Sequence, residues 1–133
     1  MLLQPKKVKY KKTRKGKLNK YNYKADLTFG TIGLKSLESG FISAQQIEAA
    51  RQAISRKIKK KGKLWIKIFP DLPITKKPTE VRMGKGKGNV SHWAAKVKGG
   101  SVIFEICGVN KKTAIKAFRT GSAKLPIKTR MFN

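Results

Sequence analysis

The segment Val81–Asn89 constrains the possible structures of this chain more than any other part of the sequence. It reads Val-Arg-Met-Gly-Lys-Gly-Lys-Gly-Asn, so that three glycines alternate with two lysines. Glycine has no Cβ, which lets its backbone adopt positive φ angles and approach other surfaces closely. The stretch before it contains residues that lack a backbone donor: Pro70, Pro73 and Pro78. We therefore predict that residues 70–90 form a long Pro/Gly-rich projecting loop, whose first part, residues 70–80, is extended, stiff and without ladder hydrogen bonds.

The same segment resembles two phosphate-binding motifs but satisfies neither. In a Walker A loop the second glycine would stand where Asn89 is, and a dinucleotide fingerprint has the spacing G-x-G-x-x-G instead of G-x-G-x-G. A bound mononucleotide is therefore not expected. A solvated, flexible linker is the plain alternative. Contact with a polyanion explains the lysines between the glycines better, so we predict that this loop binds phosphates.

The excess of positive charge indicates the kind of partner. The 133 residues contain 33 Lys and Arg against 6 Asp and Glu, a formal net charge of +27. Such a charge opposes compaction through self-repulsion. A nucleic acid would relieve it, and the release of counterions would drive the association. An anionic membrane surface is the rival partner, but no apolar run approaches the roughly 20 residues that span a bilayer, so membrane insertion is not expected.

The first 24 residues are predicted to form a basic RNA-binding arm. Residues 6–24 contain ten Lys and Arg and no acid, with three tyrosines interleaved. Without apolar periodicity, this arm is expected to be disordered alone and ordered on a nucleic acid. Its tyrosines would stack on bases or pack on the domain. Residues 25–133 are predicted to form a single domain.

The clearest helix is predicted from Ser43 to Lys61. Ser43 and the glutamine three residues later have the spacing of a capping box, and Gly62 is a typical C-terminal stop. One face carries an apolar stripe that predicts a core contact: Ile47, Ala50, Ile54 and Ile58. The other face is basic, and is either solvated or in contact with RNA.

A second helix is predicted from Lys111 to about Leu125, capped by Asn110. Its inward residues are expected to be Ala114, Phe118 and Leu125. Gly121 weakens this helix by about 1 kcal/mol and puts its last turn in doubt.

Short alternating segments predict strands. Two lie between residues 25 and 42, and a third, Leu64–Phe69, is apolar on both faces and therefore predicted to be central in a sheet. Val90–Val97 and Val102–Ile106 flank a glycine-containing turn and predict a β-hairpin. Trp93 is expected in the core, and His92 is expected to be packed or to face a phosphate. These elements predict an α+β fold, in which a small mixed or antiparallel sheet is covered by two helices.

Catalysis is not expected. The six acids are scattered, so no adjacent acidic pair suggests acid–base chemistry or a metal site. A single histidine and a single cysteine, Cys107, leave no Cys/His cluster for zinc and no internal disulfide. We therefore predict no enzyme activity, no metal and no cofactor. A cationic binder of membrane surfaces fits less well than an RNA-binding protein, because the stripe of the best helix suits a protein core.

Six segments resemble the bacterial-type large-subunit ribosomal protein of the sixteenth family, in the same order and over essentially the whole chain. They are Met1–Lys6, Gln46–Arg51, Lys63–Asp71, Pro73–Thr75, Val81–Asn89 and Lys124–Thr129. The segment at residues 81–89 is highly specific. One departure is Thr120-Gly121-Ser122, where the family has leucine and alanine.

The resemblance implies a structural constituent of the large ribosomal subunit, seated on large-subunit rRNA near the aminoacyl-tRNA site and the peptidyl transferase centre. It implies late joining in subunit assembly, help in positioning tRNA at the aminoacyl site, and contacts with neighbouring ribosomal proteins. The candidate residues for rRNA or tRNA binding lie in the loop, the arm and the first helix. They are Arg82, Gly84, Lys85, Gly86, Lys87, Gly88 and Asn89; Lys6, Lys7, Lys9, Lys11, Lys12 and Arg14; and Arg51, Arg56 and Lys60.

The resemblance also bears on the compartment. Leu72 stands where bacterial and plastid members usually have a basic residue, and in this the chain resembles mitochondrial members. The chain is rich in lysine, and Met1 coincides with the usual start of the family, without an import sequence. We therefore predict a protein encoded in a mitochondrion and located in the mitochondrial ribosome, with the plastid or the bacterial cytoplasm as alternatives.

Overall fold

A computed structural model describes residues 3–18, 26–59 and 61–133 and confirms the α+β class. Along the chain the elements are β1 (Ile32–Ser36), β2 (Gly40–Ser43), α1 (Ala44–Ile58), β3 (Lys63–Ile66), β4 (Leu72–Lys76), β5 (Asn89–Val97), β6 (Val102–Cys107), α2 (Lys111–Ser122) and β7 (Thr129–Phe132). The two short strands expected between residues 25 and 42 are β1 and β2.

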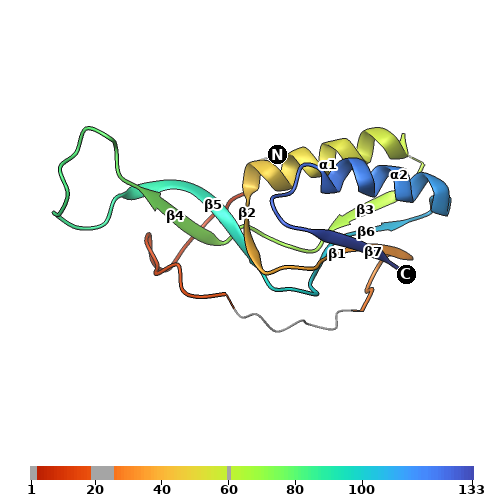
Figure 1. The fold of residues 1–133 in the computed structure, drawn as a ribbon, viewed down its shortest axis with the longest axis horizontal. Coiled ribbons are helices and arrows are strands. Elements are labelled where there is room, and N and C mark those ends of the chain that lie inside the picture. Colours follow the sequence, from red (N-terminus) through yellow and green to blue (C-terminus); the bar gives the residue numbers. More distant parts are fainter. Residues whose placement is uncertain (1–2, 19–25, 60) are drawn as a thin grey trace.

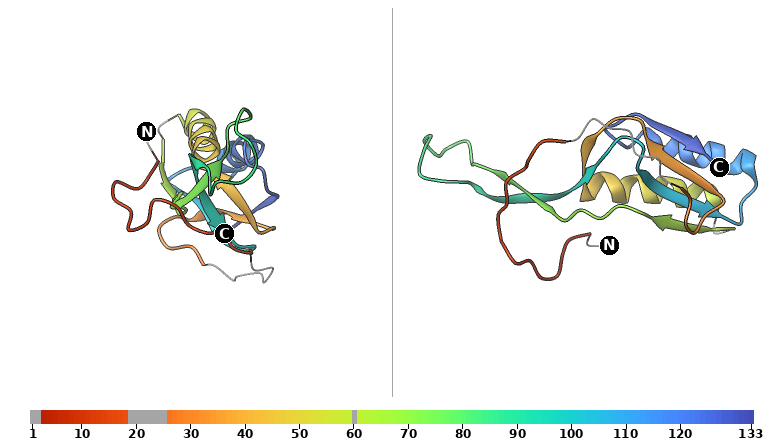
Figure 2. Two further views of the ribbon diagram at one scale, coloured as in Figure 1. Left: turned by 90° about the vertical axis from the view of Figure 1, so that its left-hand side faces the viewer. Right: turned by 90° about the horizontal axis from the view of Figure 1, so that it is seen from below.

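The strands form two sheets, and every pairing is antiparallel. One sheet has the order β3-β6-β1-β7, and the other has the order β2-β5-β4. Helices α1 and α2 lie side by side on one face of the four-stranded sheet (Figure 1). The β4–β5 ribbon extends away from this body, as the views in Figure 2 also show. The molecule therefore has a helix-covered body at one end and a projecting ribbon at the other.

Helix α1 begins with the predicted capping box. The Gln46 backbone N–H donates to Ser43 Oγ (3.3 Å), and the Ser43 backbone N–H donates to Gln46 Oε1 (2.9 Å). These reciprocal bonds satisfy donors that a helix N-terminus leaves unpaired. The apolar stripe is confirmed, since the buried residues of α1 are Ile47, Ala50, Ile54 and Ile58.

Helix α1 ends earlier than predicted. Lys59 adopts the left-handed conformation (φ 51°) and closes the helix by donating its backbone N–H to the Ser55 carbonyl (3.2 Å). Gly62 is not the stop. A Cβ at Gly62 would lie 2.5 Å from the Cys107 carbonyl oxygen and 2.3 Å from Val109 Cγ2, so this glycine allows β3 to approach the end of β6.

Helix α2 packs against α1 through a glycine. Its buried residues are Ala114, Ala117, Phe118 and Gly121. A Cβ on Gly121 would lie 2.5 Å from Ile54 Cγ1, so the missing side chain lets the two helices approach. The helix ends at Ser122, before the predicted boundary, and Leu125 is half-buried beyond it. The cost of a glycine in this helix is thus offset by closer packing.

Replacing Gly121 by valine is expected to lower the free energy of unfolding by about 1–3 kcal/mol, because the new side chain overpacks the contact with Ile54. Chemical denaturation measures this change. Lys116→Val places the same residue at an exposed site of the same helix and is the matched control. Equal stability of the two variants would show that the helices do not need this close contact.

The predicted β-hairpin between residues 90 and 106 is wrong. β5 pairs with β2 and β4, whereas β6 pairs with β1 and β3. A tight turn is present, since the Ser101 N–H donates to the Lys98 carbonyl (3.2 Å). The buried Ser36 holds this turn against the end of β1: its hydroxyl donates to the Lys98 carbonyl (2.7 Å), and its carbonyl accepts from the Gly100 N–H (2.8 Å). The two strands therefore leave the turn in different sheets.

The segment 70–80 is also more regular than predicted. β4 pairs with β5 from Leu72, opposite Ala94, to Lys76, opposite Asn89, so ladder hydrogen bonds are present. The ladder accommodates Pro73 because β4 is an edge strand of its sheet. The irregular part of the projection is therefore residues 77–88.

Two strand positions in the four-stranded sheet differ from the sequence-based expectation. β3, predicted to be central, lies at one edge, and the segment after it leaves the sheet before Phe69. β7, which was not predicted from the sequence, forms the other edge by pairing with β1. β3 is apolar on both faces because other segments pack against each of them. Leu64 packs against the core on one face, and on the other Trp65 stacks on Phe29 with ring centroids 6.1 Å apart.

Candidate nucleic-acid interface

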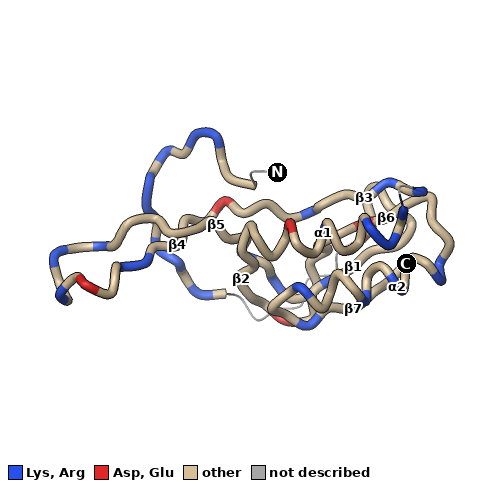
Figure 3. Tube along the Cα trace, turned by 90° about the horizontal axis from the view of Figure 1, so that it is seen from above, with Lys and Arg blue, Asp and Glu red and all other residues tan. Residues whose placement is uncertain are grey.

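The glycine–lysine loop lies at the far end of the β4–β5 ribbon. Its basic residues are spread around the loop, away from both helices, with one acidic residue, Glu80, in the same stretch (Figure 3). Residues 76–87 are all exposed, and Met83 keeps 96% of its surface accessible. Since a large apolar side chain there contacts so little of its own chain, this part of the loop does not support the core.

The loop glycines serve two different backbone needs. Gly84 (φ 95°) and Gly86 (φ 87°) have positive φ, and Lys85 between them is also left-handed (φ 51°). A Cβ at either glycine would meet nothing within 4 Å, so conformation and not space explains them. Gly88 is different, because its Cβ would lie 2.7 Å from the Lys76 carbonyl oxygen. Lys77 Nζ closes the loop by donating to the Gly84 carbonyl (2.6 Å).

The basic arm crosses the ribbon and contacts the base of this loop. Lys12 Nζ donates to the Lys87 carbonyl (3.1 Å), and Lys87 Nζ donates to the Thr13 carbonyl. Further along, Lys15 Nζ lies 4.6 Å from the centroid of the Phe41 ring on β2. Segments about 75 residues apart in sequence therefore form one surface. We call residues 6–14 together with residues 82–89 the arm–loop surface.

The arm–loop surface carries nearly all of the predicted site residues. Neither of its two segments contains an acid. The ion pairs found among the described residues all lie elsewhere, at Glu48, Glu105 and Glu38. The arm candidates are exposed: Lys6, Lys7, Lys9, Lys11, Lys12 and Arg14. Dense, carboxylate-free positive charge of this kind attracts a polyanion and makes the attraction salt-dependent.

Of the helix candidates, Arg51 is not a free cation. Arg51 donates through Nε and Nη2 to the Glu48 carboxylate (2.8 and 2.7 Å). The hydrogen bond from Arg51 lowers the pKa of Glu48 to about 2, and the same pairing raises the pKa of Arg51. Arg56 is exposed in the last turn of α1, and Lys60 lies outside the described residues. Whether any of the three contacts RNA stays a prediction.

A buried carboxylate is the main polar feature that sequence reasoning missed. Glu105 on β6 is fully buried and accepts hydrogen bonds from the backbone N–H groups of Thr28 (3.2 Å), Phe29 (2.7 Å) and Gly30 (2.8 Å). Lys67 Nζ lies 3.9 Å away. Burial alone would raise the pKa of Glu105, but these backbone donors outweigh it and the pKa is lowered. The only sequence signal was an acid within an otherwise apolar strand.

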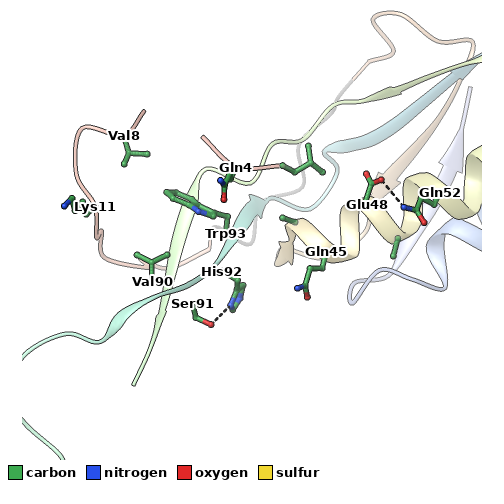
Figure 4. Close-up of a pocket in the computed structure, with 13 residues that line it drawn as sticks. Gln4, Val8, Lys11, Gln45, Glu48, Gln52, Val90, Ser91, His92 and Trp93 are labelled. Carbon is green, nitrogen blue, oxygen red and sulfur yellow. Dashed lines mark hydrogen bonds between the residues drawn. The ribbon is translucent and has the colours of Figure 1, made fainter. Parts of the chain in front are cut away.

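Trp93 is only half-buried, which differs from its predicted place in the core. It lines a groove of about 910 Å³ between the arm, the first turns of α1 and β5 (Figure 4). His92 is exposed, and its Nδ1 lies 3.4 Å from Ser91 Oγ. β5 therefore places an aromatic ring beside the arm, where the ribbon leaves the body.

Neither a metal site nor a membrane span is evident in the described part of the chain. Residues 3–18, 26–59 and 61–133 contain no group of three or more His, Cys, Asp or Glu arranged to hold a metal ion. Within the same ranges, no helix is long and apolar enough to cross a bilayer.

Comparison with known proteins agrees with the resemblance seen in the sequence. The profile of the family described as ribosomal protein L16p/L10e matches residues 5–132. Three relatives are each named large ribosomal subunit protein uL16. The protein of Bartonella quintana (strain Toulouse) is 56% identical over 130 residues, covering 97% of this chain and 95% of the relative. Those of Chelativorans sp. (strain BNC1) and Blochmanniella pennsylvanica (strain BPEN) are 55% and 53% identical, covering 97% of this chain and 95% and 96% of the relatives.

The family profile matches residues 5–132, and the three relatives are more than one half identical to this chain over nearly its whole length. The chain belongs to the ribosomal protein L16p/L10e family.

Proposed function

We propose that this protein is a structural component of the large ribosomal subunit and binds large-subunit rRNA through the arm–loop surface. Family membership supports the ribosomal role, and relatives over the full length carry the name of a large-subunit protein. The prediction that the chain is not an enzyme is confirmed by the same membership. The observation that carries the RNA-binding proposal is the joining of Lys12 and Thr13 to Lys87, which merges two acid-free basic segments.

The binding mechanism follows from the geometry of the two segments. Lysines on an extended arm and a projecting loop neutralise phosphates and release their counterions, which favours association. Gly84 and Gly86 have open space where a side chain would be, so RNA can approach the loop backbone there. The paired strands β4 and β5 hold the loop at a distance from the body. A projecting loop of this kind is better suited to enter a groove between RNA helices than to lie against a flat RNA surface.

The finer placement rests on the family resemblance. The loop tip is proposed to lie near the aminoacyl-tRNA site and the peptidyl transferase centre, where it would help to position tRNA. The same resemblance supports the proposal that the protein joins late in subunit assembly. Neighbouring ribosomal proteins are further proposed partners.

Two observations bear on the compartment. The three relatives come from bacteria, which fits the alternative of a bacterial cytoplasmic ribosome. Leu72 and the lysine-rich composition favour a mitochondrial ribosome. Finding the gene on an organellar or a bacterial chromosome decides between them.

Replacing Lys85 and Lys87 together by alanine tests the proposed function. The variant is expected to fold normally, because the loop contributes nothing to the core, but to bind large-subunit rRNA more weakly. Loss of two phosphate contacts reduces the slope of log affinity against log salt by about 2. Filter binding over a range of salt measures this slope, and gradient sedimentation measures incorporation into large subunits.

The matched control is the variant with Lys85→Arg and Lys87→Arg, which keeps both charges. It is expected to retain the wild-type salt slope. If the alanine variant shows the wild-type slope and normal subunit profiles, these lysines do not bind RNA and the proposed interface is wrong.

A further inference from the structure

The groove beside Trp93 is a cavity that the phosphate-binding surface does not explain. Its lining comes from three parts of the chain: Leu3, Gln4, Val8 and Lys11 of the arm, the first three turns of α1, and residues 90–93 of β5. Figure 4 shows the indole between the arm, with Val8 and Lys11, and the side chains Gln45, Glu48 and Gln52 of α1. One wall is thus aromatic and another carries carboxamides.

The position of Trp93 is unusual for a residue that only fills a core. Its neighbours Ala94 and Ala95 are buried at 2% exposure, whereas residues 89–92 are exposed. Trp93 therefore stands where the ribbon leaves the body, and its half-buried side chain borders the groove. Trp93 is paired with Pro73 on the edge strand β4. Because proline fixes its φ angle, the backbone opposite Trp93 is conformationally restricted.

The polar groups of the groove suit a neutral, hydrogen-bonding ligand. Glu48 would repel a nucleic acid, but its carboxylate is held by the Arg51 guanidinium (2.8 and 2.7 Å). The Gln52 amide also donates to Glu48 Oε1 (3.2 Å), which leaves the Gln52 carbonyl oxygen as an acceptor. Carboxamides present both donors and acceptors and read the edges of bases.

The rim of the groove indicates that the ligand carries negative charge outside the cavity. Lys11 lines the groove and is exposed, and the same arm exposes Lys6, Lys7, Lys9 and Lys12. A nucleotide in single-stranded RNA has both properties: its base is neutral and planar and can stack on an aromatic side chain, and its phosphate is anionic. A neutral apolar peptide segment would leave these lysines without partners.

We propose that this groove holds an unpaired nucleobase of the bound RNA, stacked on Trp93 while Lys11 and the neighbouring arm lysines contact its phosphates. The inference rests on the proposed RNA-binding function and adds a base-binding site to a surface that otherwise recognises phosphates. It makes the protein prefer RNA with a splayed base over a continuous duplex.

Trp93→Ala tests the site with a short single-stranded RNA, the same sequence as a duplex, and protein-free large-subunit rRNA. Affinity for the single strand is expected to fall by about 5- to 150-fold, which is the range for one stacked base. The slope of affinity against salt is expected to stay at the wild-type value, because no phosphate contact is lost. Trp93→Phe keeps an aromatic face and is expected to recover most of the affinity.

Tryptophan fluorescence gives a readout that leaves the groove intact. The chain has two tryptophans, so in Trp65→Phe the only indole is that of Trp93. Its emission is expected to be quenched when single-stranded RNA saturates the protein. In the matched control, Trp93→Phe, the emission of Trp65, which stacks on Phe29 outside the groove, is expected to change little.

The outcomes separate the two proposals. If the wild-type protein does not bind large-subunit rRNA, the proposed function fails and this site fails with it. If the protein binds, and the Lys85/Lys87 variant binds more weakly, but Trp93→Ala keeps full affinity and Trp93 emission is unquenched, then the base site alone is refuted. Normal RNA binding with poor incorporation of Trp93→Ala into subunits would assign the groove to a protein partner and also overturn the inference.

Discussion

Phe118→Ala is expected to lower the free energy of unfolding by about 3–5 kcal/mol, the usual cost of removing a buried aromatic ring. Phe118 is 2% exposed and belongs to the core that α2 shares with α1 and the four-stranded sheet. Its removal leaves a cavity in the layer that joins α2 to the sheet. A marginally stable domain loses a large share of its stability by such a change. Urea denaturation followed by circular dichroism measures the loss.

Ile115→Ala in the same helix is the matched control for Phe118. Ile115 is 41% exposed, so its truncation is expected to change stability by well under half as much. Similar losses in both variants would show that α2 does not use Phe118 as its main anchor.

Glu105→Ala is expected to lower the free energy of unfolding by about 3 kcal/mol, although it removes a charged residue from an apolar strand. The carboxylate accepts three backbone hydrogen bonds from residues 28–30, and its loss leaves these donors without partners. Glu105→Gln is expected to lose less, because the amide keeps one oxygen acceptor. Glu38→Ala is the control, since the Glu38 side chain is 50% exposed and its ion pair with Lys128 is at the surface.

The contribution of Glu105 is also expected to depend on pH. Its pKa is lowered in the folded protein, so around pH 4 the folded state binds fewer protons than the unfolded state and stability rises with pH. The contribution is complete above the ordinary pKa of 4.5 and is lost as the pH falls below that value. The stability difference between the wild type and Glu105→Gln is therefore expected to be constant near neutral pH and to shrink in acid. A difference that persists unchanged in acid would contradict an ionised Glu105.

Local signals in the sequence were enough to predict the helices. The capping box at Ser43 and the stripe from Ile47 to Ile58 depend only on residues within four positions of each other, and both are confirmed. The class of fold and the family follow from the same kind of local pattern. In the loop, the positive φ angles of Gly84 and Gly86 agree with what glycines between lysines indicate.

Long-range choices were less predictable. The turn at residues 98–101 is compatible with a hairpin, but Ser36, more than 60 residues away, holds it and separates β5 from β6. β4 contains a proline and reads as a loop, yet an edge position in the sheet accepts it. The sequence does not state which edge of which sheet a strand will occupy.

The candidate site divides in the same way. Its chemistry, a cationic and glycine-rich segment with a basic arm, could be read directly from residue types, because charge and the missing Cβ are properties of single residues. The meeting of Lys12 with Lys87, the burial of Glu105 and the groove beside Trp93 could not. Each of these features joins segments that are far apart in the sequence. Such contacts form, and contribute to stability, only when the two sheets and two helices have packed around the core.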